Sequence, residues 1–273
     1  MVSVIIPARN SEDTIQRCLQ SIFDQSYRNL EVIIVDNHSS DKTAKIAEKY
    51  GVRICSKGPE RSSQINEGVE VAEGKYVYRV DSDFVLDSDV VRQAVEACER
   101  EGYDAIAIHN TSDHTASLWA RVRKVERDYY RNDDTNIASR FWKKEVFEKL
   151  GGFDASLVAA EDYDFHNRLV EAGYKVGRIQ AEELHIGEPR NLAEVVQKHY
   201  YYGKNIGSFI KKNTRKALKQ LGPFRQSYFR AFSSSIGDPM LATGFVIYQV
   251  VRYTATGFGL IARIIGASKD IAE

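Results

Sequence analysis

Two carboxylates separated by one residue are the first candidates for chemistry. Asp81 and Asp83 come directly after an apolar segment at residues 75–80. Carboxylate oxygens suit Mg²⁺ and Mn²⁺, and a nucleotide diphosphate can supply the remaining ligands. Such a metal would neutralise charge on a departing nucleotide. The alternative is a turn that carries surface acids, because the Asp-x-Asp pattern is common by itself.

A third carboxylate, Asp36, follows a second apolar run at residues 30–35. A carboxylate at the end of a buried strand can hydrogen-bond a ribose or a base, as acidic residues do in dinucleotide sites. Asp36 and Asp41 could instead be turn and helix-cap residues. The pattern favours a functional Asp36 and a capping Asp41.

Glu161 and Asp162 lie at the predicted start of a helix, shortly after the sequence Gly-Gly-Phe-Asp at 151–154. The free backbone N–H groups of a helix start favour an ionised carboxylate. Such a group could act as a general base on an attacking hydroxyl. Ordinary enrichment of acidic residues in the first turn of a helix is the alternative.

Two basic side chains further along the chain could contact a metal or a phosphate. His185 lies within Glu-Leu-His-Ile-Gly-Glu at 183–188, although a single histidine is more often structural. Lys204 follows an aromatic cluster that begins at His199 and includes three tyrosines. This cluster could approach a phosphate or line an interface, and packing is the alternative.

These side chains need elements that bring them together. The continuous apolar, β-branched run at residues 2–6 is typical of a buried parallel strand, and further strands are predicted at residues 30–35, 52–55 and 75–80. Helical segments are expected between them, so a doubly wound, Rossmann-like α/β sheet is predicted. Ligands of such sheets bind outside the carboxyl ends of the strands. Asn10, Asp36 and Asp81 all fall at those ends.

The pattern changes near residue 190, the predicted boundary between a catalytic domain (1–190) and a helical region (191–273). Between Val195 and Gly237 there is no Asp or Glu, whereas the basic residues are Lys198, Lys204, Lys211, Lys212, Arg215, Lys216, Lys219, Arg225 and Arg230. This basic block indicates an anionic surface or a phosphate-bearing partner. A solvated helix face would normally include some Glu.

The segment from Pro239 to Ala262 is apolar and contains one charged residue, Arg252. It is nearly long enough to span a bilayer, but the central charge and three glycines argue against a single clean span. An interfacial helix or a re-entrant hairpin is expected, with the basic block on the cytoplasmic side. Packing on the catalytic domain or on another subunit is the alternative.

Composition limits the remaining classes of protein. The 273 residues carry no net charge, which argues against a dedicated nucleic-acid binder. Three widely spaced cysteines argue against a disulfide framework or a zinc site and favour a reducing compartment. The sequence reaches Pro7 too soon for a signal peptide. The expected location is the cytoplasmic face of the cell membrane, peripheral or partly inserted.

Taken together, these residues closely resemble the family-2 glycosyltransferases of the GT-A fold, over roughly residues 1–190. The ordered series of motifs is more specific than any one of them. It comprises VIIPARN at 4–10, VDNHSSDKT at 35–43, RSSQINEG at 61–68, AEGKY at 72–76, DSD at 81–83, FEKLGGFD at 147–154 and EDYD at 161–164.

The resemblance implies a role for each matching position on the nucleotide side. Pro7, Ala8 and Asn10 would border the base. Asp36 would contact the base or the ribose, and Gln64 and Asn66 would lie along the nucleotide pocket.

The resemblance also implies the reacting groups. Asp83 would be the principal ligand of Mn²⁺ or Mg²⁺, with Asp81 facing the ribose and the metal and His185 nearby. Asp162 would be the catalytic base, and Glu161 would shape a sugar pocket. In-line attack by the acceptor would then invert the anomeric carbon.

Two departures from the family pattern bear on the substrate. The usual acidic pair after the second strand is Asp36-Asn37 here, so a GDP-mannose or a UDP-hexose donor remains open. The QxxRW motif of large processive synthases is absent, so transfer of a single sugar is expected. By resemblance, the tail points to a membrane-held acceptor linked to polyprenyl phosphate.

Two other functions compete with this interpretation. A metal-dependent nucleotidyltransferase would need a glycine-rich phosphate loop with a basic residue after the first strand, and Pro-Ala-Arg-Asn at 7–10 is not such a loop. A non-catalytic membrane scaffold that retains the fold would need neither Asp83 nor Asp162.

Overall fold

We describe a computed structural model of the chain over residues 1–131, 133 and 138–269. The chain divides into two compact units. The first comprises Met1–Thr111, Ile137–Ala155 and Glu161–Gly187, and the second comprises Ser112–Asn136, Ser156–Ala160 and Glu188–Glu273. The second unit therefore takes two internal segments in addition to the carboxyl-terminal region.

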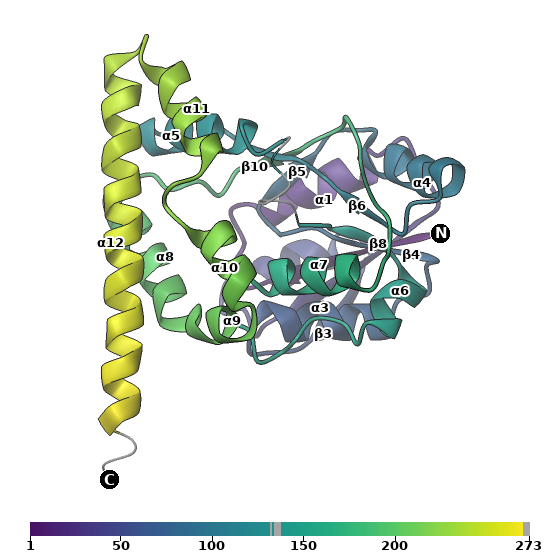
Figure 1. Cartoon of the computed structure of the whole chain (residues 1–273). Helices are drawn as coiled ribbons and strands as arrows, with labels where there is room; N and C mark the ends of the chain where they lie inside the picture. The colour runs from purple at the N-terminus through teal and green to yellow at the C-terminus, as the bar shows by residue number, and fades with distance from the viewer. Residues whose placement is uncertain (132, 134–137, 270–273) are drawn as a thin grey trace. The chain divides into compact units, whose positions relative to one another are not determined.

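The first unit is built on a seven-stranded sheet (Figure 1). Its strands, in spatial order, are β3 (Arg53–Ser56), β2 (Leu30–Asp36), β1 (Val2–Ala8), β4 (Tyr76–Arg79), β8 (Phe141–Lys143), β6 (Ala105–Ala107) and β9 (Val176–Arg178). Only β8 runs antiparallel to its neighbours among these strands. The predicted doubly wound, mostly parallel sheet is confirmed.

Both faces of the sheet are covered by helices, because alternate side chains of each strand point to opposite faces. Val4 and Ile6 of β1 belong to one buried cluster, and Ile5 between them belongs to the other. The first cluster is covered by α1 (Ile15–Phe23), α2 (Thr43–Glu48) and α4 (Val90–Glu101). The second is covered by α3 (Arg61–Glu70), α6 (Lys144–Lys149) and α7 (Glu161–Glu171).

A second, three-stranded sheet was not predicted. Its order is β5 (Phe84–Leu86), β10 (Glu183–His185) and β7 (Asn110–Ser112). Three-residue strands are too short to show a periodic pattern. The antiparallel pairing of β5 with β10 sets His185 opposite Phe84, the residue after Asp83.

The second unit is helical. Its helices are α5 (Leu118–Asp128), α8 (Leu192–Asn205), α9 (Gly207–Lys212), α10 (Thr214–Leu221), α11 (Gln226–Ser235) and α12 (Pro239–Lys269). Their shared core contains Val122, Val195, Tyr228, Ala231, Phe245 and Tyr248. The region after residue 190 is thus helical, as its composition predicts.

The alternative of a re-entrant hairpin in the tail is wrong, because α12 is one unbroken helix (Figure 1). Gly259 of this helix serves close packing instead of a turn. A Cβ on Gly259 would lie 2.2 Å from the carbonyl oxygen of Tyr200, and one on Gly203 would lie 2.1 Å from that of Thr256. Glycine on each helix therefore lets the backbones of α8 and α12 approach closely.

A buried ionic cluster holds α12 to α5. Arg252 of α12 and Arg123 of α5 both form ion pairs with the fully buried carboxylate of Glu126, at 2.6 and 2.8 Å. His199 of α8 lies beside them, with Nε2 3.4 Å from the Tyr248 hydroxyl. Burial, reinforced by the nearby Arg252 and Arg123 guanidinium groups, lowers the pKa of His199 to about 2.

This depressed pKa predicts a pH dependence of stability. In the unfolded chain His199 titrates near 6.5, so below that pH the unfolded state binds a proton that the folded state excludes. The stability associated with a neutral His199 is present above pH 6.5 and declines as the pH falls. We expect wild type to lose about 2 kcal/mol more than His199→Gln between pH 7 and pH 5. Urea titrations of both proteins at the two pH values, with hydrogen exchange of α12 as the probe, measure this; equal losses would contradict it.

Candidate active site

The centre of the candidate site is Asp81, which lies just beyond the carboxyl end of β4 and is held by arginines. Arg79 donates to both of its oxygens, with Nη2 3.0 Å from Oδ2, and Arg140 Nη2 lies 2.9 Å from the same Oδ2. A third guanidinium, of Arg61 on α3, lies 3.8 Å from Oδ1.

The reversal of β8 explains why two of these arginines converge. Tyr78 of β4 pairs with Phe141 of β8, so the residues that follow Tyr78 and precede Phe141 emerge at the same edge. They are Arg79 and Arg140, and the backbone N–H of Arg79 donates to the Arg140 carbonyl at 2.9 Å. The sheet topology itself therefore places both guanidinium groups on Asp81.

The charge state of Asp81 follows from these contacts. Burial by itself raises the pKa of Asp81, but Arg79, Arg140 and Arg61 outweigh it and hold the pKa well below the ordinary range. Arg140 also forms an ion pair with the buried Glu183, at 3.0 Å. Asp81 is thus a fixed anion whose two oxygens are occupied by protein cations.

Asp83 lies beside a different partner. Its Oδ2 is 3.1 Å from Nε2 of His185, which the β5–β10 pairing brings opposite. A Cβ on Gly187 would lie 2.3 Å from the same oxygen, so the glycine leaves the room that this carboxylate occupies. One carboxylate oxygen and one imidazole nitrogen therefore share a small space at the edge of the sheet.

Glu161 and Asp162 form the start of α7, as predicted, and their environments differ. Glu161 is buried, and Nε of Arg61 donates to its Oε1 at 2.8 Å. Burial raises the pKa of Glu161, against the lowering effect of Arg61. The side chain of Asp162 is 22% exposed and lies 3.8 Å from Nη1 of Arg79. Asp162 is the more accessible carboxylate of the two.

The same arginines connect the two carboxylate groups. Arg61 lies between Asp81 and Glu161, and Arg79 lies between Asp81 and Asp162. Groups predicted separately, after β4 and at the start of α7, thus belong to one charged cluster.

The expected nucleotide side is formed by the ends of β1 and β2. Ala8 is in register with Asp36, which accepts hydrogen bonds from the backbone N–H of Ser39 at 2.9 Å and from its hydroxyl at 2.5 Å. Asn10 Oδ1 accepts from the backbone N–H of Ser40 at 2.9 Å. Asn10 therefore ties the two loops together and does not cap α1, which has no side-chain cap.

Gln64 of α3 holds the ends of β1 and β2 together. Its buried amide donates to the carbonyl oxygen of Ala8 at 3.1 Å and to that of Val35 at 2.5 Å. The interaction joins β1 to β2 just before they end, where Pro7 pairs with Val35. Gln64 therefore contacts the backbone of β1 and β2, next to Asp36, the residue predicted to contact the nucleotide.

Asn66 and Lys204 have contacts of other kinds. The Asn66 amide donates to the Phe153 carbonyl and accepts from its N–H, at 2.8 and 2.9 Å, so it holds the Gly-Gly-Phe-Asp turn. Lys204 lies on α8 in the second unit, with its ammonium group 6.0 Å from the centre of the Tyr200 ring.

Arg61, Arg79, Arg140 and Glu183 were not among the predicted site residues. One signal was available for Arg79, since it is a charged residue at the end of the apolar run 75–80. Arg140 and Glu183 belong to segments whose pairing partners cannot be read from local sequence.

Comparison with known families decides the class of this protein. The model of glycosyl transferase family 2 matches residues 3–153, more than half of the chain. The chain belongs to glycosyl transferase family 2. As a member of that family it is a glycosyltransferase that uses a nucleotide-sugar donor.

Relatives of this family-2 glycosyltransferase differ in length. Glycosyltransferase AglE of Haloferax volcanii is 24% identical over 220 residues, which cover 74% of this chain and 72% of AglE. The hyaluronan synthase of Pasteurella multocida is 40% identical over 264 residues, which cover 86% of this chain but only 23% of that enzyme.

A solved structure supports the fold. The mannosyltransferase PcManGT of Pyrobaculum calidifontis, in complex with GDP-Man and Mn²⁺, superposes with a TM-score of 0.64 at 18% identity, over 97% of this chain and 86% of that one. The expected GT-A fold is confirmed.

Proposed function

We propose that this chain is an inverting glycosyltransferase that moves one hexose from GDP-mannose or a UDP-hexose to a membrane-held acceptor on polyprenyl phosphate. The observation that carries the proposal is the charged cluster in which Arg79 joins Asp81 to Asp162. The carboxylate on the donor side, Asp81, and the proposed base, Asp162, would thus be held at a fixed distance before the substrates bind. A nucleotidyltransferase has no corresponding use for Asp162.

Asp83 and His185 would hold the metal. Within the residues that the structure describes, no three His, Cys, Asp or Glu side chains cluster as a ready-made metal site. The neighbouring carboxylate and imidazole are nevertheless ligands that suit Mn²⁺, and a diphosphate and water would supply the others. When bound, the metal would neutralise charge on the leaving diphosphate. Because arginines occupy Asp81, we assign Asp81 to positioning and to the ribose.

Asp162 would act as the general base. Its Oδ1 accepts from the backbone N–H of Tyr163 at 2.9 Å, which fixes the carboxylate at the start of α7. Arg79 lies on its other side. The exposed part of the carboxylate would take the proton of the acceptor hydroxyl as that oxygen attacks. Glu161, bound by Arg61, would shape the adjoining sugar pocket.

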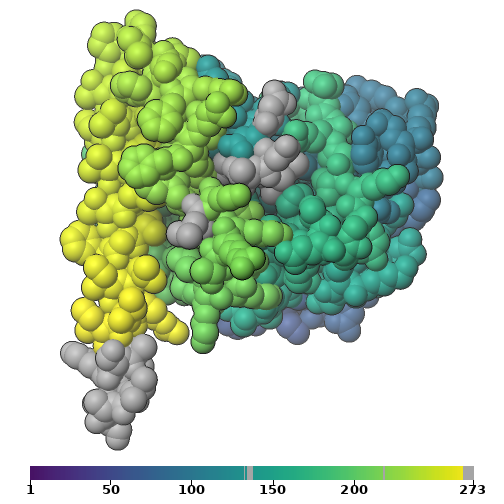
Figure 2. Space-filling model, viewed as in Figure 1, coloured from purple at the N-terminus to yellow at the C-terminus, as the bar shows by residue number. Residues whose placement is uncertain are grey.

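The acceptor side of the proposal rests on α12 and the basic block. By length and composition, Pro239–Gly266 could cross a membrane. Figure 2 shows the atoms of α12, in yellow, at the surface of the helical unit. The exposed apolar side chains of this helix include Val246, Ile247, Val250, Phe258, Ile261, Ile264 and Ile265. The opposite face carries Arg252 into the buried cluster. A helix with one packed and one apolar face favours an interfacial position on the cytoplasmic side of the membrane.

Donor turnover tests the proposal. Purified protein, Mn²⁺ and a panel of nucleotide sugars are combined with short polyprenyl-phosphate acceptors, and nucleotide release is followed. We expect release with one donor class, and we expect Asp83→Ala to lower it by at least about a hundredfold, because several kcal/mol of charge stabilisation are lost.

The matched control is Asp24→Ala, an exposed carboxylate at the end of α1, which should keep the wild-type rate. Nucleotide release that is unchanged by chelation of the metal and by Asp83→Ala would refute the assignment of Asp83. Absence of both turnover and nucleotide binding across the panel would refute the enzyme.

A further inference from the structure

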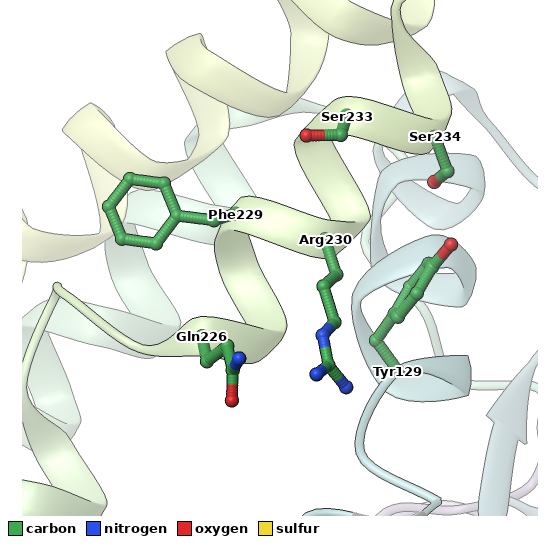
Figure 3. A pocket seen from close by; sticks show the side chains of 6 residues that line it. All are labelled: Tyr129, Gln226, Phe229, Arg230, Ser233 and Ser234. Carbon is green, nitrogen blue, oxygen red and sulfur yellow. The ribbon is translucent and has the colours of Figure 1, made fainter.

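The helical unit contains a pocket that the proposed reaction does not use. It lies between the end of α5 and one face of α11, has a volume of about 570 Å³, and is lined by Tyr129, Gln226, Phe229, Arg230, Ser233 and Ser234 (Figure 3). Pockets of several hundred cubic ångströms are of the size that binds small molecules. All lining residues belong to the second unit.

The spacing of the α11 residues explains why polar groups gather there. Gln226, Arg230 and Ser234 are four residues apart, so they occupy one face of the helix. In Figure 3 Arg230 extends from this face toward Tyr129, whereas the ring of Phe229 is turned to the other side of α11. The pocket therefore combines a guanidinium, an amide, hydroxyls and the edge of an aromatic ring.

Arg230 supplies the positive charge of this pocket. Across residues 1–131, 133 and 138–269, no hydrogen bond or ion pair involves its guanidinium. Nearby acids of the unit have other partners: Asp128 pairs with Lys124 and Asp238 with Arg121, both at 2.7 Å. Arg230 thus remains an exposed cation in a chain segment that lacks acidic residues.

We propose that this pocket binds the phosphate group of a phosphate-bearing acceptor. A guanidinium matches the geometry of a phosphate and can donate two parallel hydrogen bonds to it. The amide of Gln226, which lies on the same side of the pocket as the guanidinium group in Figure 3, can donate to a remaining oxygen. The phosphate is held as an anchor, while a hydroxyl of the acceptor reacts elsewhere.

This inference rests on the proposed function, since it assigns a binding site to the acceptor class. A phosphoester can come from a lipid headgroup in a membrane or from a soluble sugar phosphate. Both present the same tetrahedral phosphate group to Arg230. The experiment therefore uses one soluble phosphate and one lipid phosphate as separate probes.

The test uses the full chain with two probes. Glycerol 3-phosphate is titrated by calorimetry, and binding to phosphatidylcholine vesicles with and without polyprenyl phosphate is measured by sedimentation. We expect Arg230→Ala to weaken binding of at least one phosphate probe about tenfold, as loss of a charge-assisted hydrogen bond implies. Arg230→Lys should retain part of the affinity because it keeps the charge.

Arg190→Ala is the matched control, since Arg190 is an exposed cation of the same unit outside the pocket and the basic block. Loss with the vesicle probe alone identifies a lipid phosphate, and loss with glycerol phosphate identifies a soluble one. Equal weakening by Arg190→Ala, or no phosphate binding by wild type, overturns the inference. Failure of the proposed function appears separately, as absence of nucleotide release in the donor panel.

Discussion

Asp162→Asn should lower kcat by about 10²–10⁴-fold with a hydroxyl acceptor, the range in which general-base catalysis contributes. The substitution keeps the shape of the side chain and replaces the basic carboxylate with an amide, which is far too weak a base to take the proton. Donor binding should change little, because Asp83, His185 and the β1–β2 corner are untouched. Steady-state kinetics and calorimetric titration of the nucleotide measure the two effects separately.

Glu171→Gln provides the control for Asp162, because it removes an exposed carboxylate at the other end of α7. We expect near-wild-type kcat for it. If Asp162→Asn retains kcat while Asp83→Ala loses it, Asp162 is not the base, and an acceptor that arrives already ionised is indicated.

Glu126→Gln should destabilise the helical unit by about 3–5 kcal/mol, the cost of removing one partner from a buried ion pair. Glu126 is fully buried and faces Arg123 and Arg252. Its amide replacement removes the carboxylate that faces both guanidinium groups and leaves Arg123 with the more distant Glu188, at 4.0 Å. Urea unfolding, with hydrogen exchange of α12 as the local probe, measures the loss.

Two further variants make this prediction specific. Asp128→Asn removes an exposed partner of Lys124 on the same helix and should cost less than about 1 kcal/mol. Glu126→Leu combined with Arg252→Met should recover part of the stability, because an apolar pair carries no desolvation cost. Equal effects of Glu126→Gln and Asp128→Asn would contradict a buried cluster.

The same carboxylate has a defined pH dependence. Burial raises the pKa of Glu126, but Arg123 and Arg252 more than offset this and lower the pKa far below its ordinary value. Its contribution to stability is therefore complete above about pH 4.3, the unfolded value, and is lost as the pH falls toward the folded pKa. The stability gap between wild type and Glu126→Gln should narrow in strong acid.

The large strands could be predicted because their residues are buried on both faces. β1, β2 and β4 each carry apolar runs that need no knowledge of their neighbours, and their carboxyl ends placed Asp36 and Asp81 at one edge. The helical character of the region beyond residue 190 was likewise visible in its composition.

Other parts depended on pairing between distant segments. The partner of Asp83 is set by β10, about a hundred residues later, and that of Asp81 by the reversed strand β8. The pairing of β5 with β10 and that of β4 with β8 cannot be predicted from the residues next to Asp83 or Asp81 in the sequence. Arg252 illustrates the same limit: its charge argued for a broken span, whereas Glu126, far away in sequence, neutralises it within an unbroken helix.

The reversal of β8 also affects how such proteins can diversify. β8 begins at the edge where β4 and β6 end, so the chain leaves the sheet after β6 and re-enters it from the same side. The segment at residues 112–136 can therefore be lengthened or exchanged, because a connection that starts and ends at the same edge does not have to cross a face of the sheet. Evolution can therefore exchange this segment while the seven-stranded sheet is inherited unchanged.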